Sequence, residues 1–385
     1  MPCLLPPPPM ALGHIDFTQA DMKTWLAEVE AAKAAIDIAG TPMILLGANS
    51  ALAQPFVARA LALESVLALV DNARAGRSDH GVPVLDDAGL RDLLAEKPLA
   101  IGVLCCSSKE AIAHFTAIWA GHGPLLSFFE AICLWPETAR AGQPFAFLKA
   151  FADTSLVLNL HHEGRSAFGD TLSRQTFDAI MLYRLTWDAG YLEKVNRPEK
   201  AIYFEPDVMP LSQHEVLVDG GAFDGDTVRD FVAKTGGRYD HIHAFELDPH
   251  NAAAFVAKTA GIDSLSLYQT GLWDGPASLR LEQRSDNCSR ISDTGGLSVP
   301  LQALDNMNLG RISLFKLDIE GAEIEALEGA RRLIVTHKPK LALSAYHKCD
   351  DFATLLAKVR SMRQDYVFSL RHYSQVIFDS VIYAI

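Results

Sequence analysis

Three carboxylates in the second half of the chain stand where a binding site could form. Asp219, Glu246 and Asp318 each come directly after a short run of apolar residues. Short apolar runs bounded by turn signals predict buried strands. Because the carboxyl ends of parallel strands meet at one edge of a sheet, where ligands bind in open α/β folds, we expect these carboxylates to share one site.

The segment between Asp219 and a helical stretch at residues 227–235 is rich in glycine. A strand, a glycine turn and a helix N-terminus together bring backbone N–H groups close to a ligand. The turn residues that we expect to contact the ligand are Gly220, Gly221, Phe223, Gly225 and Thr227.

The acid at Glu246 stands about twenty residues beyond the glycine turn, where a carboxylate can accept hydrogen bonds from both ribose hydroxyls. Leu247 follows it, and Asp219 could attract an amine. The turn also contains Asp224 and Asp226, which would repel a pyrophosphate. S-adenosylmethionine has an amine, a carboxylate and a ribose but no phosphate, so these residues favour it over NAD.

Candidate catalytic residues follow two further apolar runs, at residues 312–317 and 340–344, which we expect to be strands. Asp318 is expected where substrate meets cofactor, with Glu320 two residues later, and His347 could be a general base near neutral pH. Lys348 would depress the pKa of His347 if it lay close. His372 is a candidate for substrate contact. No complete set of metal ligands is recognisable, so we predict no metal site and leave metal dependence open.

The composition is that of a globular protein with two domains. The chain has 385 residues, and its net charge of −13 argues against nucleic-acid or anionic-membrane partners. No apolar run reaches the ~20 residues that span a bilayer. Residues 1–16, with four consecutive prolines, predict a disordered tail. Six scattered cysteines indicate buried thiols in a reducing cytoplasm.

The first half alternates between helix and strand patterns, which predicts a Rossmann-like α/β domain over residues 17–150. It could bind a dinucleotide through Asp71, but its turn at residues 47–52 lacks the three glycines that a pyrophosphate requires. The expected elements are helices at 17–38, 54–63 and 107–121, strands at 43–47 and 65–70, and continued alternation over 84–94 and 100–106.

The middle region, residues 151–210, is expected to be a helical lead-in, with a helix at 177–187. His161 and His162 are adjacent and point apart, so we expect no metal site there. The second sheet is expected to have strands, with helices between, at residues 216–218, 242–245, 265–268, 312–317 and 340–344. A terminal pair at 366–370 and 376–385 is joined too closely for a parallel crossover, so its last strand must be antiparallel. This pattern is typical of the class I methyltransferase sheet.

Several motifs in the second half occur together and in order. They are VDGGAFDGDT at 218–227, FELDP at 245–249, VPLQALDNM at 299–307, FKLDIEGAE at 315–323, YHKCDDF at 346–352 and LRHYS at 370–374. With these motifs the chain resembles the FkbM family of S-adenosylmethionine-dependent methyltransferases. The resemblance implies a methyltransferase domain over 211–385, S-adenosylmethionine as cofactor, and O-methylation of a hydroxyl on a sugar, glycan or secondary metabolite.

Two other functions stay open at this point. One is a non-catalytic module on a methyltransferase fold that binds a glycan or a protein. The other is an NAD-dependent oxidoreductase that uses the first domain. For the methyltransferase, the expected partner is a small-molecule or saccharide substrate, and a homo-oligomer is possible.

Overall fold

The computed structural model describes most of the chain between residues 42 and 385. The described residues are 24, 27, 28, 31, 42–48, 53–62, 65–98, 100–106, 109–127, 131, 164–186, 190–282, 290–291 and 297–385. The chain divides into two compact units, one of residues 1–158 and 182–188 and the other of residues 159–181 and 189–385. Each unit has its own sheet and its own apolar core.

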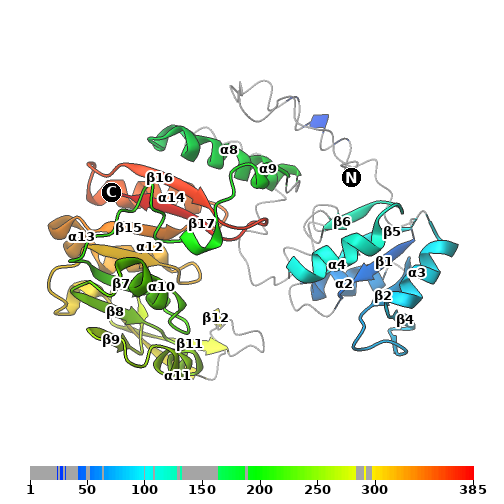
Figure 1. The fold of residues 1–385 in the computed structure, drawn as a ribbon, viewed down its shortest axis with the longest axis horizontal. Coiled ribbons are helices and arrows are strands. Elements are labelled where there is room, and N and C mark those ends of the chain that lie inside the picture. The colour runs from blue at the N-terminus through cyan, green and yellow to red at the C-terminus, as the bar shows by residue number, and fades with distance from the viewer. Residues whose placement is uncertain are drawn as a thin grey trace. The chain divides into compact units, whose positions relative to one another are not determined.

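The first unit is an α/β domain with a six-stranded sheet in the order β3-β4-β2-β1-β5-β6 (Figure 1). All neighbours in it pair in parallel except β3 and β4, which are antiparallel. Its elements are β1 (Met43–Leu46), α2 (Gln54–Leu61), β2 (Val66–Val70), β3 (Ser78–Asp79), β4 (Val82–Leu85), α3 (Asp87–Glu96), β5 (Ile101–Leu104), α4 (Lys109–Trp119) and β6 (Leu125–Ser127). The predicted alternation is present, whereas the β3–β4 pair and β6 were not predicted.

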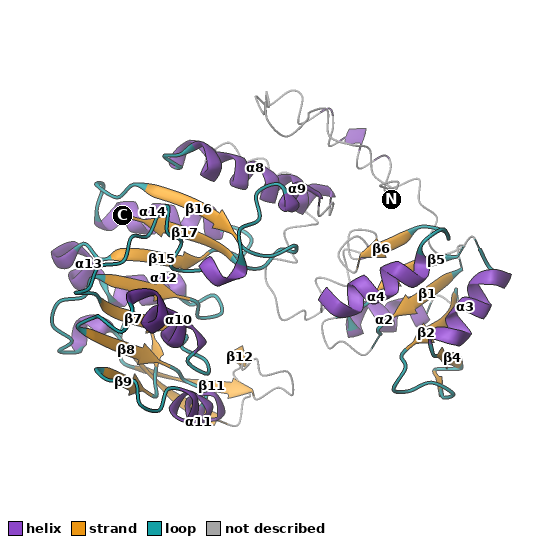
Figure 2. Ribbon diagram, viewed as in Figure 1, coloured by secondary structure: helices purple, strands orange, loops and turns teal. Residues whose placement is uncertain are grey.

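The second unit contains a seven-stranded sheet in the order β16-β17-β15-β14-β7-β8-β9 (Figure 2). Its strands are β7 (Val216–Gly220), β8 (His241–Phe245), β9 (Leu265–Tyr268), β14 (Leu314–Leu317), β15 (Lys340–Ser344), β16 (Phe368–His372) and β17 (Ser380–Ala384). Five are parallel, and β17 runs antiparallel to both β15 and β16. The terminal antiparallel pair is as the sequence predicts, although Arg371 and His372, expected in its turn, belong to β16.

Helices connect the parallel strands, and the residues at the helix ends are of types that commonly cap helices. They are α10 (Asp226–Thr235), α11 (Pro249–Lys258), α12 (Glu323–Gly329), α13 (Arg331–His337) and α14 (Asp351–Met362). At the start of α11, the Asp248 carboxylate accepts hydrogen bonds from the N–H groups of His250 and Asn251. At the end of α10, Gly236 adopts the left-handed conformation common after helices.

A small mixed sheet separates β9 from β14 in the sequence. The strands β10 (Gly271–Leu272), β11 (Ala277–Glu282), β12 (Arg290–Ile291) and β13 (Leu297–Gln302) form a four-stranded sheet in the order β10-β13-β11-β12, followed by the 3₁₀ turn η4 (Leu304–Asn306). The sequence prediction of a helix between these two parallel strands was wrong. Residues 277–282 alternate apolar and polar side chains, which is the period of a strand.

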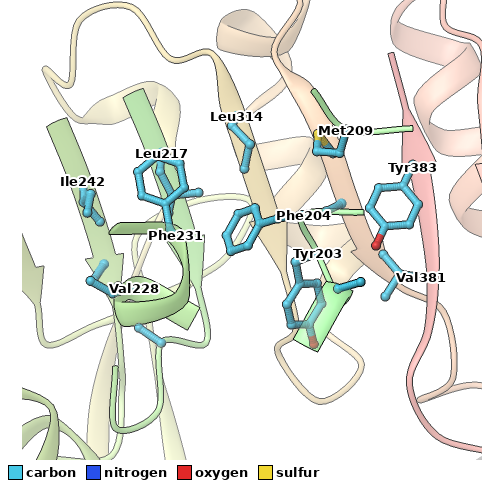
Figure 3. Close-up of a cluster of buried hydrophobic side chains, with 14 of the residues drawn as sticks. Tyr203, Phe204, Met209, Leu217, Val228, Phe231, Ile242, Leu314, Val381 and Tyr383 are labelled. Carbon is cyan, nitrogen blue, oxygen red and sulfur yellow. The ribbon is translucent and has the colours of Figure 1, made fainter. Parts of the chain in front are cut away.

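The segment before β7 contains η2 (Arg165–Ala167), α8 (Thr171–Thr186), α9 (Gly190–Glu193) and η3 (Glu199–Ala201). Its last part is packed onto the core of the second unit. Tyr203, Phe204 and Met209 belong to the cluster that Leu217, Ile242, Leu314, Val381 and Tyr383 form on one face of the sheet (Figure 3). Helix α8 begins six residues before the predicted 177. The expected helix at 17–38 falls mostly outside the described residues, and His161 and His162 fall wholly outside them.

Candidate active site

The predicted carboxylates meet at one edge of the second sheet. The parallel register pairs Gly220 of β7 with Phe245 of β8 and with Leu317 of β14. The residues that follow these three therefore lie side by side. This register brings the glycine turn, Glu246 and Asp318 together, as the sequence predicts.

The glycines of the turn are required by close contacts within the protein. Gly221 has a φ of +78°, and a Cβ there would lie 1.9 Å from the carbonyl oxygen of Asp318. Gly225 has a φ of +83°, and its Cβ would lie 2.4 Å from Thr259 Cγ2. Gly220 is confined by Leu317, whose Cδ2 would be 2.8 Å from its Cβ. These glycines allow the turn to pack against the adjoining strand and helix.

Three N–H groups of the turn are bonded inside the protein. Those of Gly221 and Ala222 both donate to the carbonyl oxygen of Phe245, each at 3.0 Å. That of Phe223 donates to Glu246 Oε2 at 2.8 Å. The expectation that the turn presents these N–H groups to a ligand's carboxylate was wrong, since each already has an acceptor.

Glu246 is buried and oriented by the backbone. Its Oε2 accepts from Phe223, and its Oε1 accepts from the N–H of Asp248 at 2.7 Å. Burial raises the pKa of this carboxyl, and the two N–H donors oppose the rise. The side chain of Asn251 also donates to this carboxyl. Because a carboxylate has about four acceptor positions, Glu246 can still accept a hydrogen bond from a ligand hydroxyl.

The other predicted cofactor residues lie around this carboxylate in different environments. Phe223 is exposed at 39% and has a φ of +45°, so its ring stands at the surface of the turn. Thr227 is buried in the first turn of α10, and Leu247 is half-buried beside Gly271. The carboxylate of Asp224 is paired with Arg229 and Lys258. It would therefore repel a pyrophosphate less than the sequence suggested.

Asp219 is fully buried and paired with a lysine that sequence reasoning missed. Lys316, in the interior of β14, places its Nζ 2.9 Å from Asp219 Oδ1. Burial raises the pKa of Asp219, and the ammonium group of Lys316 opposes that rise. The charge partner expected for Asp219, an amine of the ligand, is thus supplied by the protein.

Asp318 accepts hydrogen bonds from two tyrosines. Tyr203 donates to Oδ2 at 2.6 Å, and Tyr346 donates to Oδ1 at 2.9 Å. Burial alone would raise the pKa of Asp318, but His347, Lys316 and these hydroxyls together lower it. The side chain is still 24% exposed, so an ionised carboxylate can be reached from solvent.

His347 lies among three carboxylates. Its Nδ1 is 3.0 Å from Glu323 Oε1, and its Nε2 is 3.3 Å from Asp318 Oδ1 and 3.9 Å from Glu320 Oε2. Burial alone would lower the pKa of His347, but the carboxylates raise it to about 10. The expectation of a base with a near-neutral pKa was wrong, because these charges outweigh any effect of Lys348.

The two glutamates after Asp318 have different environments. Glu323 is buried, and its Oε1 accepts from the N–H groups of Ile319 at 3.0 Å and Gly321 at 3.4 Å, so it fixes the start of α12. Glu320 has a φ of +56°, and its side chain is 61% exposed. Glu320 is therefore the carboxylate that solvent or a substrate can reach beside Asp318.

His372 does not reach the site surface. It lies in β16 with no exposed area, and its Nδ1 is 2.9 Å from Ser380 Oγ. The suggestion that it contacts substrate was wrong, because the residue is internal to the terminal strand pair.

Tyr203, Tyr346 and Lys316 are the site residues that the sequence did not single out. Tyr203 comes from the lead-in, 115 positions before Asp318, and no spacing in the sequence connects the two residues. Tyr346 precedes a residue that was predicted. Lys316 had a clearer signal, since a charged residue inside a buried apolar strand requires a partner.

The described residues contain no group of three His, Cys, Asp or Glu side chains arranged to hold a metal ion. Among the same residues, no helix is both long and apolar enough to cross a membrane.

Known proteins and structures match the chain as follows. The family model of the methyltransferase FkbM domain matches residues 219–370, and no curated protein sequence matches the chain. The crystal structure of methyltransferase FkbM from Methylobacillus flagellatus KT is 23% identical, with a TM-score of 0.75 over 94% of this chain and 99% of that one. A putative methyltransferase from Streptococcus mutans in complex with SAH is 14% identical, with a TM-score of 0.32 over 50% of this chain and 99% of that one.

The alignment with the Methylobacillus structure shows a shared fold over nearly the whole chain. It confirms the predicted fold class, a methyltransferase sheet preceded by a smaller α/β domain. The range that the family model matches includes Asp219, Glu246 and Asp318 and most of the predicted motifs. Residues 219–370 therefore match the methyltransferase FkbM domain, as the motifs of this region predict.

Proposed function

We propose that the chain is an O-methyltransferase whose acceptor is a hydroxyl group of a sugar, a glycan or another small metabolite. The position of Asp318 carries this proposal. Asp318 directly follows β14, and its ionised, partly exposed carboxylate lies at the sheet edge where Glu246 also lies. A carboxylate at that point can accept a hydrogen bond from a hydroxyl group and orient its oxygen.

The residues around Glu246 fit the cofactor. When bound, S-adenosylmethionine supplies an electrophilic methyl group on a sulfonium. We assign the ribose hydroxyls to Glu246, whose carboxylate is held in place by two N–H donors and can still accept a hydrogen bond from a ligand hydroxyl. Phe223, Thr227 and Leu247 are the neighbouring contacts in this assignment. Gly220, Gly221 and Gly225 shape the turn, and Asp219 acts through Lys316.

Asp318 is the group that receives the acceptor's proton in this proposal. Bound cofactor would supply the methyl group to the acceptor oxygen and keep the sulfur as its leaving group, and the O–H of the methylated oxygen would be strongly acidic. A carboxylate with a low pKa can therefore still take the proton and release it to water. His347 and the two tyrosines keep Asp318 ionised beforehand, and exposed Glu320 is placed to contact the acceptor.

Calorimetry and product analysis on the full chain test this function. The parent should bind S-adenosylmethionine, and Glu246→Ala should weaken binding by about 1.5–3 kcal/mol, with Glu246→Gln intermediate because it keeps one acceptor oxygen. Incubation with labelled cofactor and fractionated sugars and metabolites should label a hydroxyl. Unchanged affinity in Glu246→Ala would remove that residue from the site. Cofactor binding without any labelled product would favour the non-catalytic module, and tight binding of NADH would favour the oxidoreductase.

A further inference from the structure

Lys316 is a buried ammonium group whose polar partners all belong to the protein. The residue is 1% exposed and lies between Phe315 and Leu317 in β14. Its Nζ is 2.9 Å from Asp219 Oδ1, and it donates to the carbonyl oxygens of Gly221 at 2.7 Å and Gly220 at 3.1 Å.

The group stays charged in this environment. Burial alone would lower the pKa of Lys316, but the carboxylates of Asp219 and Asp318 raise it. The ring of Tyr203 covers the ammonium group, with its centroid 5.0 Å from Nζ, and the hydroxyl of Tyr203 donates to Asp318. Lys316 thereby contacts the glycine turn directly and is linked to the carboxylate of Asp318 through Tyr203.

We infer that Lys316 is a positioning residue that holds the glycine turn in the conformation that binds the cofactor. By attracting two successive carbonyl oxygens, it fixes the orientation of the peptide groups on either side of Gly221. The next N–H groups then face Phe245, and the N–H of Phe223 faces Glu246. Lys316 thus orients the carboxylate of Glu246, to which the ribose hydroxyls are assigned, without touching the cofactor itself. This inference rests on the proposed cofactor contacts of Glu246.

The competing explanation is that Lys316 only neutralises Asp219. A pair of full-length variants separates the two roles. Lys316→Met leaves a buried carboxylate without its partner and should unfold at lower urea concentration than the parent. Lys316→Met combined with Asp219→Asn removes both charges and should recover most of that stability. The two carbonyl oxygens lose their donor in both variants.

Two measurements decide between these roles. Calorimetry should show cofactor binding at least about tenfold weaker in both variants, because the donor to the turn is absent from both. Hydrogen exchange in the absence of cofactor should be faster in residues 219–225 of both variants. Lys340→Met is the matched control, since Lys340 pairs with Glu215 at 2.6 Å and donates to the carbonyl oxygen of Pro210 at the other end of the sheet. Lys340→Met should change neither the cofactor affinity nor the exchange rates of residues 219–225.

Parental affinity and parental exchange in the stable double variant would overturn the inference, and Lys316 would then be a counter-ion only. Failure of the parent itself to bind S-adenosylmethionine would instead contradict the proposed function. In that case the exchange rates of residues 219–225 still decide whether Lys316 orders the turn.

Discussion

Asp318 is the residue on which the proposed reaction depends. Asp318→Asn keeps the shape of the side chain and removes its charge, so kcat should fall about a hundredfold or more. The affinity for S-adenosylmethionine should change little, because the assigned ribose contact is Glu246. Initial rates and calorimetry on the same preparations measure both effects. Near-normal turnover would mean that positioning of the acceptor is sufficient without this carboxylate.

His347 should stabilise the fold in a pH-dependent way. Its pKa is raised from 6.5 to about 10 in the folded protein, so its stabilising contribution is complete below about pH 6.5 and lost as pH rises toward 10. Within that window the loss is about 1.4 kcal/mol per pH unit. Urea unfolding of the parent and His347→Gln at several pH values should show a stability difference that shrinks as pH rises. A constant difference would mean that the pKa of His347 is not raised above its ordinary value in the folded protein.

The same charge state has a consequence for catalysis. Because His347 remains protonated near neutrality, it cannot act as the general base there. The rate of the parent enzyme should not rise through a pKa near neutrality, as it would if deprotonation of His347 were required. The pH dependence of kcat/KM tests this. A rise centred near the ordinary histidine pKa, absent from His347→Gln, would restore His347 as the base.

The sequence predicted the acids of the site better than their partners. Asp219, Glu246 and Asp318 could be placed because strand ends meet at one sheet edge. Tyr203 could not, since its contact with Asp318 spans 115 positions and depends on how the lead-in folds over the sheet. The pKa of His347 depends on the approach of Glu323 and Glu320, which the periodicity of the sequence does not specify.

At the scale of elements, the glycine turn gives a direct comparison of two glycines with positive φ. Gly221→Ala combines the left-handed conformation with a Cβ only 1.9 Å from the carbonyl oxygen of Asp318, whereas Gly237 has a φ of +72° and open space around it. Gly237→Ala should cost about 1 kcal/mol, and Gly221→Ala should cost several times more and weaken cofactor binding. Urea unfolding and calorimetry measure the difference. Equal losses would show that the turn can move away from β14.

The parallel strands were more predictable than the insertion between β9 and β14. Each parallel strand is a short apolar run, and residues 265–268 and 340–344 were predicted with their observed bounds. Strand β11 of the insertion instead alternates apolar and polar residues, so a search for apolar runs does not find it. Strand β14 begins two residues after the predicted 312, because pairing with its neighbours, rather than apolar character, sets its start.

At the scale of the whole molecule, the lead-in is anchored to the terminal strand pair. Arg371 of β16 donates to Ser173 Oγ at 2.8 Å and to Asp207 Oδ2 at 3.0 Å. Glu205 is buried, and its carboxylate binds Arg197 and accepts from Tyr373. These contacts join Ser173 and residues 197–207 to the end of the chain. These parts of the lead-in therefore belong to the second unit, and they supply Tyr203 to its site.

This anchoring predicts where the methyltransferase unit can be separated from the rest of the chain. A fragment of residues 211–385 lacks Tyr203, Phe204 and Met209, which are buried in the unit's core (Figure 3). Their burial stabilises by about 1.5–3 kcal/mol each, a large part of the ~5–15 kcal/mol that holds a domain folded. Residues 211–385 alone should therefore unfold without a cooperative transition and bind no cofactor. Residues 159–385 keep the lead-in and should unfold cooperatively in urea, as followed by circular dichroism. A cooperative transition at the same midpoint in both fragments would show that the lead-in does not stabilise the unit. Tyr203 would then not be part of the proposed site.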